Sequence, residues 1–434
     1  MPLREMQYQG PKDWPGIRAW LEKRAAPDPD LEKRVREILD NVEKRRDAAL
    51  VEYTRRFDCE TMTRARLKVS QKKIRASSAK IPKKDLKILE EAAGNIRAFH
   101  ENQKQRSFWT TQADGTILGQ KISPVDRAGL YVPGGQAGKT PLLSSLLMTA
   151  VPAITAGVGQ IAVVSPPRPD GTLNPYIPAA AAMLGIHEIY ACGGPWAVAA
   201  LAFGTQTIPK VDVVAGPGNI HVTEAKRLLT GRVGIDMIAG PSEIVILADG
   251  STDPEFAAAD LLSQAEHDAL ASAVLVTADK TLSTRIKKVL AAQLKKLPQN
   301  KTASKSLADF GAIIVTKTLD QAVELINLMA PEHLELALAD PWSTLGRIQN
   351  AGAVFVGPHS PEPVGDYFAG PNHVLPTLGT ARFSSGLGVS NFCKKTNIIA
   401  TSKDFVIEHG AKIARLARLE GLEAHARSVE IRMK

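Results

Sequence analysis

The segment EIVILADGSTDPEFAAADLLSQAEHDALASAVLVT, residues 243–277, contains the pattern that decides the fold. Two short apolar runs, EIVILAD at 243–249 and AVLVT at 273–277, enclose the run Pro254–His267, in which apolar residues recur at helical spacing. Near-continuous apolar runs of this length are typical of strands that are buried on both faces of a parallel sheet. A strand, a helix and a second strand in this order therefore predict a βαβ unit.

The same alternation recurs after about residue 120 and predicts an α/β fold with two parallel sheets. We expect one α/β domain at 121–241 and a second at 242–385. Residues 1–120 should form a helical N-terminal segment that packs partly on the second domain. Residues 386–434 should form a helical C-terminal extension. The other predicted strands and helices are QIAVVS (160–165), HEIYACGG (187–194), VDVVAGPGN (211–219), GAIIVT (311–316), AVFVG (353–357), and the helical runs 30–57, 81–103, 178–184, 196–203 and 404–429.

Composition is that of an ordinary soluble globular chain, with 434 residues, 44% of them hydrophobic and 23% charged. The three cysteines, Cys59, Cys192 and Cys393, are odd in number and far apart, which fits a reducing compartment and no disulfide framework. The first residues lack the apolar core of a signal peptide. We therefore expect a cytoplasmic protein.

Two segments suggest a nucleic-acid or membrane partner at first sight. The run Arg64–Lys87 has ten Lys and Arg residues and one acid, but no aromatic residue to stack on bases and no nucleic-acid-binding motif, so we favour a solvated helical surface. A non-enzymatic nucleic-acid-binding protein is an alternative that rests on this run alone. The uncharged stretch Thr140–Pro167 is interrupted by Pro152 and Gly157, and a buried helix followed by a strand explains it better than a membrane span.

Two glycine-rich turns are candidate ligand-binding loops. GLYVPGGQAGKT at 129–140 is one residue short of the spacing of a P-loop, which argues against a nucleotide triphosphatase. AGPGN at 215–219 follows a buried strand and leads into a helix, the place where an open α/β sheet presents ligands. Neither turn has the GxGxxG spacing of the dinucleotide fingerprint.

Polar residues that suit a metal or a catalytic site gather in five short motifs. Gln264 and His267 are three residues apart, so they share a face at the end of the predicted helix. An isolated pair of this kind is more often solvated, but several such motifs together would give a metal nitrogen and oxygen ligands without sulfur, which suits zinc or a similar divalent ion. The other motifs are AGPSE with Ser242 and Glu243, APEHLE with Glu332 and His333, PVGDYFAGPNHVLP with Asp366 and His373, and EGLEAHA with Glu420, Glu423 and His425.

In this order, the motifs closely resemble those of the histidinol dehydrogenase family from about residue 30 to residue 430. The resemblance rests on GLYVPGG, AGPGN with VTEAKR, IDMIAGPSE, DLLSQAEHD, APEHLEL, GDYFAGPNHVLPT and EGLEAHA. It implies two incomplete Rossmann-like domains in a zinc-containing homodimer. It also implies the last step of histidine biosynthesis, in which L-histidinol is oxidised through L-histidinaldehyde to L-histidine while two NAD are reduced.

The resemblance also implies a role for individual residues. Glu332 and His333 become the acid/base pair, Tyr131 and Asn219 contact NAD, and His373 lies on the substrate side. One position departs from the family, which usually has GGAQA where this chain has Gly193–Ala197, GGPWA; Trp196 thus replaces a glutamine that contacts NAD, and stacking would replace a hydrogen bond. The zinc ligands implied are Gln264, His267, Asp366 and His425, and these four, with Ser242, His333 and Glu420, bind the substrate.

The residue types fit this chemistry, because turning an alcohol into an acid needs two hydride removals and one addition of water. His333 would take the hydroxyl proton and Glu332 would activate water. Zinc would hold the imidazole and amine nitrogens of the substrate, and NAD would take the hydride. A cysteine thiohemiacetal is a disfavoured alternative, because neither Cys192 nor Cys393 is well placed by sequence.

Two further expectations concern the substrate and the assembly. A related dehydrogenase of another polar alcohol, such as a sulfonated diol, is the alternative function, and Ser242 in AGPSE together with the EGLEAH motif favours histidinol. The predicted C-terminal helix has one apolar stripe and must dock on something to stay ordered. Docking on a neighbouring subunit would bring His425 to a zinc ion held by the other chain, so that each site would be shared between two subunits.

Overall fold

The second α/β domain is built on a six-stranded parallel sheet. The computed structural model describes residues 3–25, 29–135, 140–298 and 300–434, and its strand order in this sheet is β1-β11-β10-β9-β12-β13. The run EIVILA is buried at every position, because alternate side chains enter separate cores on the two faces. The strands are β1 (Arg4–Tyr8), β9 (Glu243–Ala248), β10 (Ser272–Thr277), β11 (Gly311–Thr316), β12 (His333–Ala337) and β13 (Ala353–Val356).

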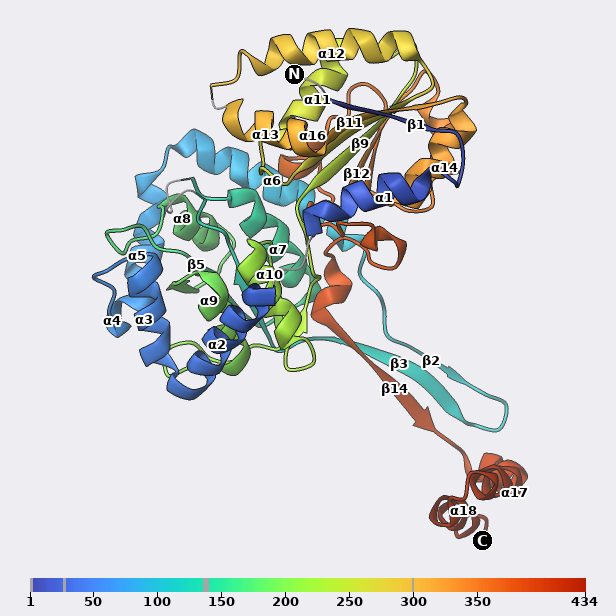
Figure 1. Cartoon of the computed structure of the whole chain (residues 1–434). Helices are drawn as coiled ribbons and strands as arrows, with labels where there is room; N and C mark the ends of the chain where they lie inside the picture. The colour runs from blue at the N-terminus through green and yellow to red at the C-terminus, as the bar shows by residue number, and fades with distance from the viewer. Residues whose placement is uncertain (1–2, 26–28, 136–139, 299) are drawn as a thin grey trace.

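Helices cover both faces of this sheet (Figure 1). Ile244 and Ile246 pack with α11, α12 and α13, whereas Val245 and Leu247 pack with α1 and α14. The helices of this domain are α1 (Trp14–Glu22) with the 3-10 turn η1 (Lys23–Ala25), α11 (Pro254–Ala265), α12 (Lys280–Leu294), α13 (Asn300–Phe310), α14 (Leu319–Met329), α15 (Pro341–Leu345) and α16 (Glu362–Tyr367).

The first α/β domain has a five-stranded parallel sheet in the order β6-β5-β4-β7-β8. Its core also takes in apolar side chains of the N-terminal helices, Leu31 and Val35 among them. The strands are β4 (Arg127–Tyr131), β5 (Gln160–Ser165), β6 (Glu188–Ala191), β7 (Val213–Ala215) and β8 (Gly234–Ile235). The helices are α2 (Pro29–Arg45), α3 (Asp47–Phe57), α4 (Arg64–Leu67), α5 (Gln71–Ser77), η2 (Ser78–Lys80), α6 (Lys83–Glu101), α7 (Leu143–Ala156), α8 (Tyr176–Met183), α9 (Gly194–Phe203) and α10 (Ile220–Leu229).

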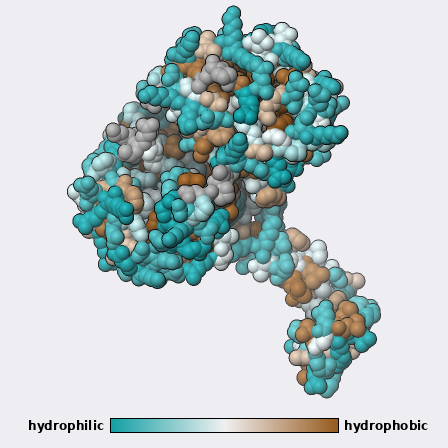
Figure 2. All heavy atoms as spheres, viewed as in Figure 1, coloured by the Kyte–Doolittle hydropathy of each residue, from teal (hydrophilic) through white to brown (hydrophobic). Residues whose placement is uncertain are grey.

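An arm projects from the two domains and ends in a helical hairpin (Figure 1). Its stem is an antiparallel sheet of β2 (Phe108–Thr111), β3 (Ile117–Pro124) and β14 (Cys393–Ala400), and its tip is α17 (Lys403–Leu419) and α18 (Glu423–Glu430). Two short 3-10 turns, η4 (Thr380–Arg382) and η5 (Val389–Phe392), precede β14. Hydrophobic residues gather on the outside of this arm (Figure 2). The exposed ones are Phe108, Trp109, Leu118, Ile399, Ile407, Ile413, Leu416, Leu419, Leu422 and Ile431.

The α/β prediction is confirmed, and the named strands lie where the sequence predicts them. Three details differ. The predicted helix 30–57 is two helices, because Arg46 between them has a positive φ of 53°. The predicted helix 404–429 is likewise a hairpin that turns at Gly421, whose φ is 76°. The N-terminal segment 1–120, which was predicted to be helical, contributes a strand, β1, to the second sheet.

Two expectations about ligands and membranes concern the first domain. Among the described residues, no helix has the length and apolar content that crossing a bilayer requires. The uncharged stretch instead forms α7 and β5, as predicted. Residues 136–139 of the near-P-loop lie outside the described residues.

Candidate active site

The candidate site lies at the amino end of the second sheet. Glu243 is the first residue of β9 and His333 the first of β12, and these strands are neighbours. Because α11 runs back from the carboxyl end of β9, its last turn carries Gln264 to the same edge, and His267 follows two residues after the helix ends. The parallel order thus brings together motifs that are up to about 90 residues apart.

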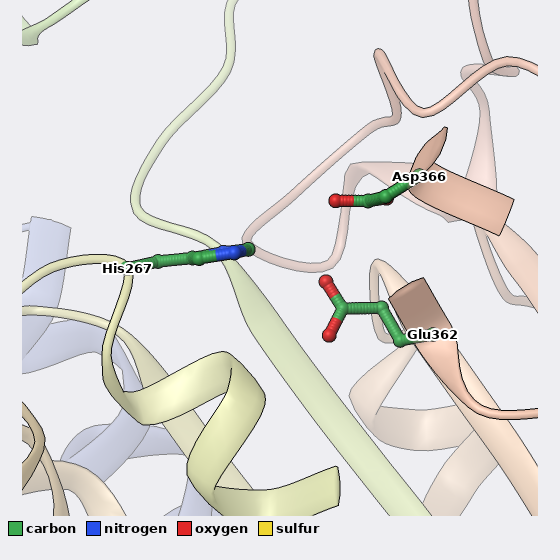
Figure 3. Close-up of side chains that lie close together, drawn as sticks. All are labelled: His267, Glu362 and Asp366. Atoms are coloured by element: carbon green, nitrogen blue, oxygen red, sulfur yellow. The ribbon is translucent and has the colours of Figure 1, made fainter. Parts of the chain in front are cut away.

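Three side chains at this edge could hold a metal ion. Ligand atoms of His267, Glu362 and Asp366 lie within 4.8 Å of one another. Figure 3 shows His267 pointing toward the two carboxylates, which α16 presents from the opposite side. Glu362 and Asp366 are four residues apart, so a single helical turn places both on one face.

Glu362 is the member of this cluster that the sequence reasoning missed. It is only 1% exposed, and its Oε1 has no hydrogen-bond partner among the described residues. Its Oε2 accepts a hydrogen bond from Ser263 Oγ at 3.1 Å. The four-residue spacing to Asp366 was the available signal, but a single glutamate between two prolines gave no reason to expect a helical turn.

The buried carboxyl groups fit a bound divalent cation. Burial raises the pKa of Glu362 to about 7, and the nearby charge of Asp366 adds to this rise. Burial also raises the pKa of Asp366 to about 7. A cation would stabilise both groups as carboxylates, and an imidazole with carboxylates is a donor set that zinc accepts. The unpartnered Oε1 of Glu362 is the observation that most favours a missing positive group.

Gln264 connects this cluster to His333. The side chain of Gln264 is fully buried. Its Nε2 lies 3.2 Å from Nδ1 of His267, and its Oε1 lies 3.2 Å from Nδ1 of His333. Gln264, His267 and Asp366 are therefore brought together as predicted, with Glu362 added to them.

The neighbours of His333 determine which of its two ring nitrogens carries the proton. Nδ1 lies 3.1 Å from the carbonyl oxygen of Glu243 and 3.2 Å from Oε1 of Gln264, both of which are acceptors. Nδ1 must therefore carry the proton, and Nε2 is left with a free lone pair. Nε2 is buried and has no partner among the described residues. Burial lowers the pKa of His333 to about 3, so the ring is neutral near pH 7, with its lone pair on Nε2.

Glu332 lies beside His333 and is just as deeply buried. Its Oε2 accepts a hydrogen bond from the main-chain N–H of Glu243 at 2.8 Å and lies 3.7 Å from Nδ1 of His333. Burial raises the pKa of Glu332 well above its usual value, although the hydrogen bond from Glu243 favours the carboxylate. A carboxylate with a raised pKa is a stronger base than one in water.

The other residues that were predicted to lie near the substrate divide into two groups. His373 is near the cluster, with Nδ1 3.0 Å from the carbonyl oxygen of Asp366, and burial lowers the pKa of His373 to about 4. Ser242 directly precedes β9. Glu420 and His425, by contrast, are exposed on the helical hairpin at the tip of the arm (Figure 1). One chain alone therefore does not bring them to the cluster.

The two residues predicted to contact NAD lie at helix starts in the first domain. Tyr131 ends β4, and its hydroxyl accepts a hydrogen bond from the N–H of Gly194, the first residue of α9, at 3.2 Å. Asn219 caps α10, and its side chain accepts from the N–H groups of His221 and Val222. Both sites are at the carboxyl ends of parallel strands, where open α/β sheets bind nucleotides.

Trp196 makes its stacking contacts inside the protein. Trp196 is 6% exposed, and its ring stacks on those of Tyr53 and Phe57 of α3, with centroids 5.8 and 5.1 Å away. The expected stacking on a cofactor is thus replaced by packing between α9 and α3.

The cysteines are poorly suited to the thiohemiacetal route. Cys192 is fully buried at the end of the first sheet, and burial raises the pKa of its thiol far above the usual value. Cys393 begins β14 in the arm, and burial raises its pKa as well. Neither thiol belongs to the polar cluster, and a raised pKa disfavours the thiolate that acts as nucleophile.

Comparisons with known proteins agree over the whole chain. The family model described as histidinol dehydrogenase matches residues 21–433. The chain is 60% identical over 433 residues to a histidinol dehydrogenase of Oleidesulfovibrio alaskensis, covering 100% of both chains. It is 58% identical to one of Nitratidesulfovibrio vulgaris, covering 100% of this chain and 99% of the other. The crystal structure of histidinol dehydrogenase from Elizabethkingia anophelis is similar with a TM-score of 0.92 and 35% identity, over 99% of this chain and 98% of that one.

Proposed function

This chain belongs to the histidinol dehydrogenase family, and we propose that the cluster at the amino end of the second sheet is where it oxidises L-histidinol. The chain is an NAD-dependent oxidoreductase of histidine biosynthesis, in a family that uses zinc and NAD. The alternative substrate, a sulfonated diol, is not favoured. The single observation that supports this location best is the neutral His333, whose Nδ1–H faces two acceptors while Nε2 has no hydrogen-bond partner among the described residues.

In the proposed site, Gln264, His267 and Asp366 hold zinc, with the carboxylate of Glu362 beside them. When bound, zinc supplies a fixed positive centre that orients the imidazole and amine nitrogens of histidinol. Tyr131 and Asn219 would hold NAD, which would supply the hydride acceptor for both oxidations. Ser242 and His373 lie on the substrate side of the cluster.

The protein's own residues move the protons. His333 accepts the hydroxyl proton of the alcohol at Nε2, which prepares the carbon to lose hydride. Glu332 accepts a proton from water as the water oxygen bonds to the aldehyde carbon, which gives the hydrate in its anionic form, and this species is oxidised next.

The complete site requires a second copy of the chain in this proposal. His425 as fourth zinc ligand and Glu420 as substrate contact would come from the arm of a neighbouring subunit, in a homodimer with two equivalent sites. Support comes from the exposed apolar side chains of the arm, which a partner would cover. Residues 386–434 would then be the exchanged extension, with 121–241 and 242–385 as the two α/β domains and 1–120 as the segment that adds β1 to the second domain.

We also propose a cytoplasmic location, because the three cysteines are free, as expected in a reducing compartment.

The test is an NADH assay with a defined substrate set. L-Histidinol should yield two NADH per molecule and L-histidine as product, whereas L-histidinaldehyde should yield one. A sulfonated diol should yield no NADH above background. Turnover of the diol with no turnover of histidinol would contradict the proposed function.

A further inference from the structure

An arginine from the N-terminal segment reaches the main chain beneath the Glu332–His333 pair. Arg24 lies in η1, just after α1, and is 5% exposed. Helix α1 is held against the second domain by its buried residues Ile17 and Trp20. The indole N–H of Trp20 donates to the carbonyl oxygen of Asp309 at 3.2 Å. The position of the guanidinium is therefore set by packing some distance from the site.

The guanidinium of Arg24 contacts the turn that begins β9. Nη2 forms a buried ion pair with Oε2 of Glu243. Nη1 lies 3.5 Å from the carbonyl oxygen of Ser242, and Nε donates to the carbonyl oxygen of Leu21 within its own turn. The arginine thus holds two consecutive residues of the second domain while being anchored to α1.

The main chain of Glu243 forms hydrogen bonds with both Glu332 and His333. Its N–H donates to Oε2 of Glu332 at 2.8 Å, and its carbonyl oxygen accepts from Nδ1 of His333 at 3.1 Å. Its side chain is 9% exposed; Arg24 contacts Oε2 of the carboxylate, and the N–H of Leu378 donates to Oε1. Any shift of this residue would move both hydrogen bonds of the catalytic pair at once.

A buried carboxylate of this kind depends on its cationic partner. Removing one member of a buried ion pair leaves an uncompensated charge, and the side chain then moves toward water or takes up a proton. For Glu243, either response would disturb the start of β9. Glu332 and His333 would be displaced with it, although neither touches Arg24 in the structure.

We propose that Arg24 is a positioning residue for the reaction, which acts by fixing Glu243 and through it the hydrogen bonds of Glu332 and His333. This inference rests on the proposed roles of these two residues. Arg24 does not contact the reacting atoms in this account. It should therefore affect the rate of the chemical step more than the binding of either substrate.

The first domain offers a matched control. Arg127 and Glu188 form another partly buried ion pair, with side-chain exposures of 8% and 29%. This pair joins the first residues of β4 and β6 in the other sheet and has no contact with β9 or β12. Arg127→Met should destabilise the fold as Arg24→Met does, without disturbing the Glu332–His333 pair.

The experiment compares kcat and KM in the zinc-loaded full-length enzyme for Arg24→Met, Arg24→Lys, Glu243→Gln, the double variant Arg24→Met/Glu243→Gln, and Arg127→Met. Arg24→Met should lower kcat by a factor on the order of 10², the typical cost of a misplacement near 1 Å, with KM for NAD unchanged. Arg24→Lys should recover part of this loss, because it keeps the charge. The double variant should have a higher kcat than Arg24→Met, because it contains no unpaired charge. Arg127→Met should keep kcat within about twofold of the wild type.

Two results would overturn the inference. One is a kcat within twofold of the wild type for Arg24→Met. The other is an equal loss of kcat in Arg24→Met and Arg127→Met, which would indicate general destabilisation. If Arg24→Met does not fold, Arg24→Lys and the double variant decide, and wild-type kcat in both would contradict the proposal. His333→Ala is measured in parallel: full activity in that variant would refute the proposed function itself, whereas its loss beside an active Arg24→Met would refute only the role of Arg24.

Discussion

At the scale of single residues, the chemistry depends on how burial sets the protonation of neighbouring groups. His333 is held neutral because its environment disfavours the charged ring and its Nδ1–H faces two acceptors. Glu332 is in a similarly buried place, but the same environment raises its proton affinity. Two adjacent residues thus become an imidazole that stays neutral near pH 7 and a carboxyl group whose proton affinity is raised.

This difference predicts separable effects in the two half-reactions. His333→Ala should slow the oxidation of histidinol to the aldehyde by a factor on the order of 10²–10⁴, the usual cost of removing an acid/base group. Glu332→Gln should slow the oxidation of supplied L-histidinaldehyde more than it slows hydride loss from the alcohol. Single-turnover NADH formation from each substrate measures both. Equal losses in both half-reactions for both variants would refute the division of roles.

Asp58 provides a residue-scale prediction away from the cluster. It follows α3, its Oδ2 has no partner among the described residues, and burial raises its pKa to about 7. The folded state therefore binds a proton more tightly than the unfolded state does. The contribution of Asp58 to the free energy of unfolding is therefore fully present below about pH 4, and it is lost as the pH rises through about 7.

Asp58→Asn should accordingly raise the free energy of unfolding at pH 8 by roughly 1–3 kcal/mol, a value reduced for partial exposure, and leave it nearly unchanged at pH 4. Thermal unfolding at the two pH values is the measurement. An equal effect at both would mean that the charge of Asp58 is not responsible.

At the scale of elements, short helical turns supply the polar groups of the site. One turn of α16 presents Glu362 and Asp366 on the same face, and the end of α11 presents Gln264 and His267. The adjacent strands β9 and β12 hold the proposed catalytic pair, Glu332 and His333, between these two helices. The cation site therefore depends on the packing of α16 against α11 as well as on the individual ligands.

Removing a donor from either helix should weaken zinc binding. His267→Ala should release the metal, and Glu362→Gln should lower zinc affinity, because an anionic donor in the cluster is lost. We expect about one zinc per subunit in the wild type, and chelation should abolish turnover. Glu266→Gln is the matched control, since Glu266 is exposed beside His267 and outside the cluster. Metal analysis of each variant decides, and full activity of a verified metal-free enzyme would contradict the assignment.

At the scale of the whole molecule, the arm is the feature that a single chain leaves unexplained. Its strands and helices expose large apolar side chains, Ile399 and Leu416 among them, at 74% and 63%. It also carries Glu420 and His425 away from the residues with which they were predicted to act (Figure 1). Docking of the arm on a second copy of the chain would bury these apolar side chains. It would also bring Glu420 and His425 to the cluster of that second copy.

Complementation tests this arrangement. An inactive His267→Ala chain is mixed with an inactive His425→Ala chain under conditions that allow subunit exchange. If sites are shared, heterodimers regain one site with four wild-type ligands, and activity should return to at most about a quarter of the wild-type level per total chain, because half of the dimers are mixed and each has one intact site. Each variant exchanged with itself is the control. No recovery would remove the shared site while leaving the zinc assignment standing.

The local signals in the sequence determined most of the scaffold and its motifs. Strands such as β9 and β10 are buried on both faces, so their near-continuous apolar runs are visible without any neighbour. The family motifs likewise placed Gln264, His267 and Asp366 in one site. Strands β1, β2 and β3 gave no such signal, because they expose many of their side chains and lack a continuous apolar run.

Only the tertiary structure decided which residues complete the site. Glu362 joins the cluster because α16 folds against α11. Arg24 reaches Glu243, outside the cluster, because α1 packs on the second sheet, although more than 200 residues of sequence separate the two. Trp196 turned toward α3 for the same kind of reason, since Tyr53 and Phe57 offer aromatic surface that a local motif does not reveal. A buried charge or ring takes its role from partners brought close by packing, and those partners are far away in the chain.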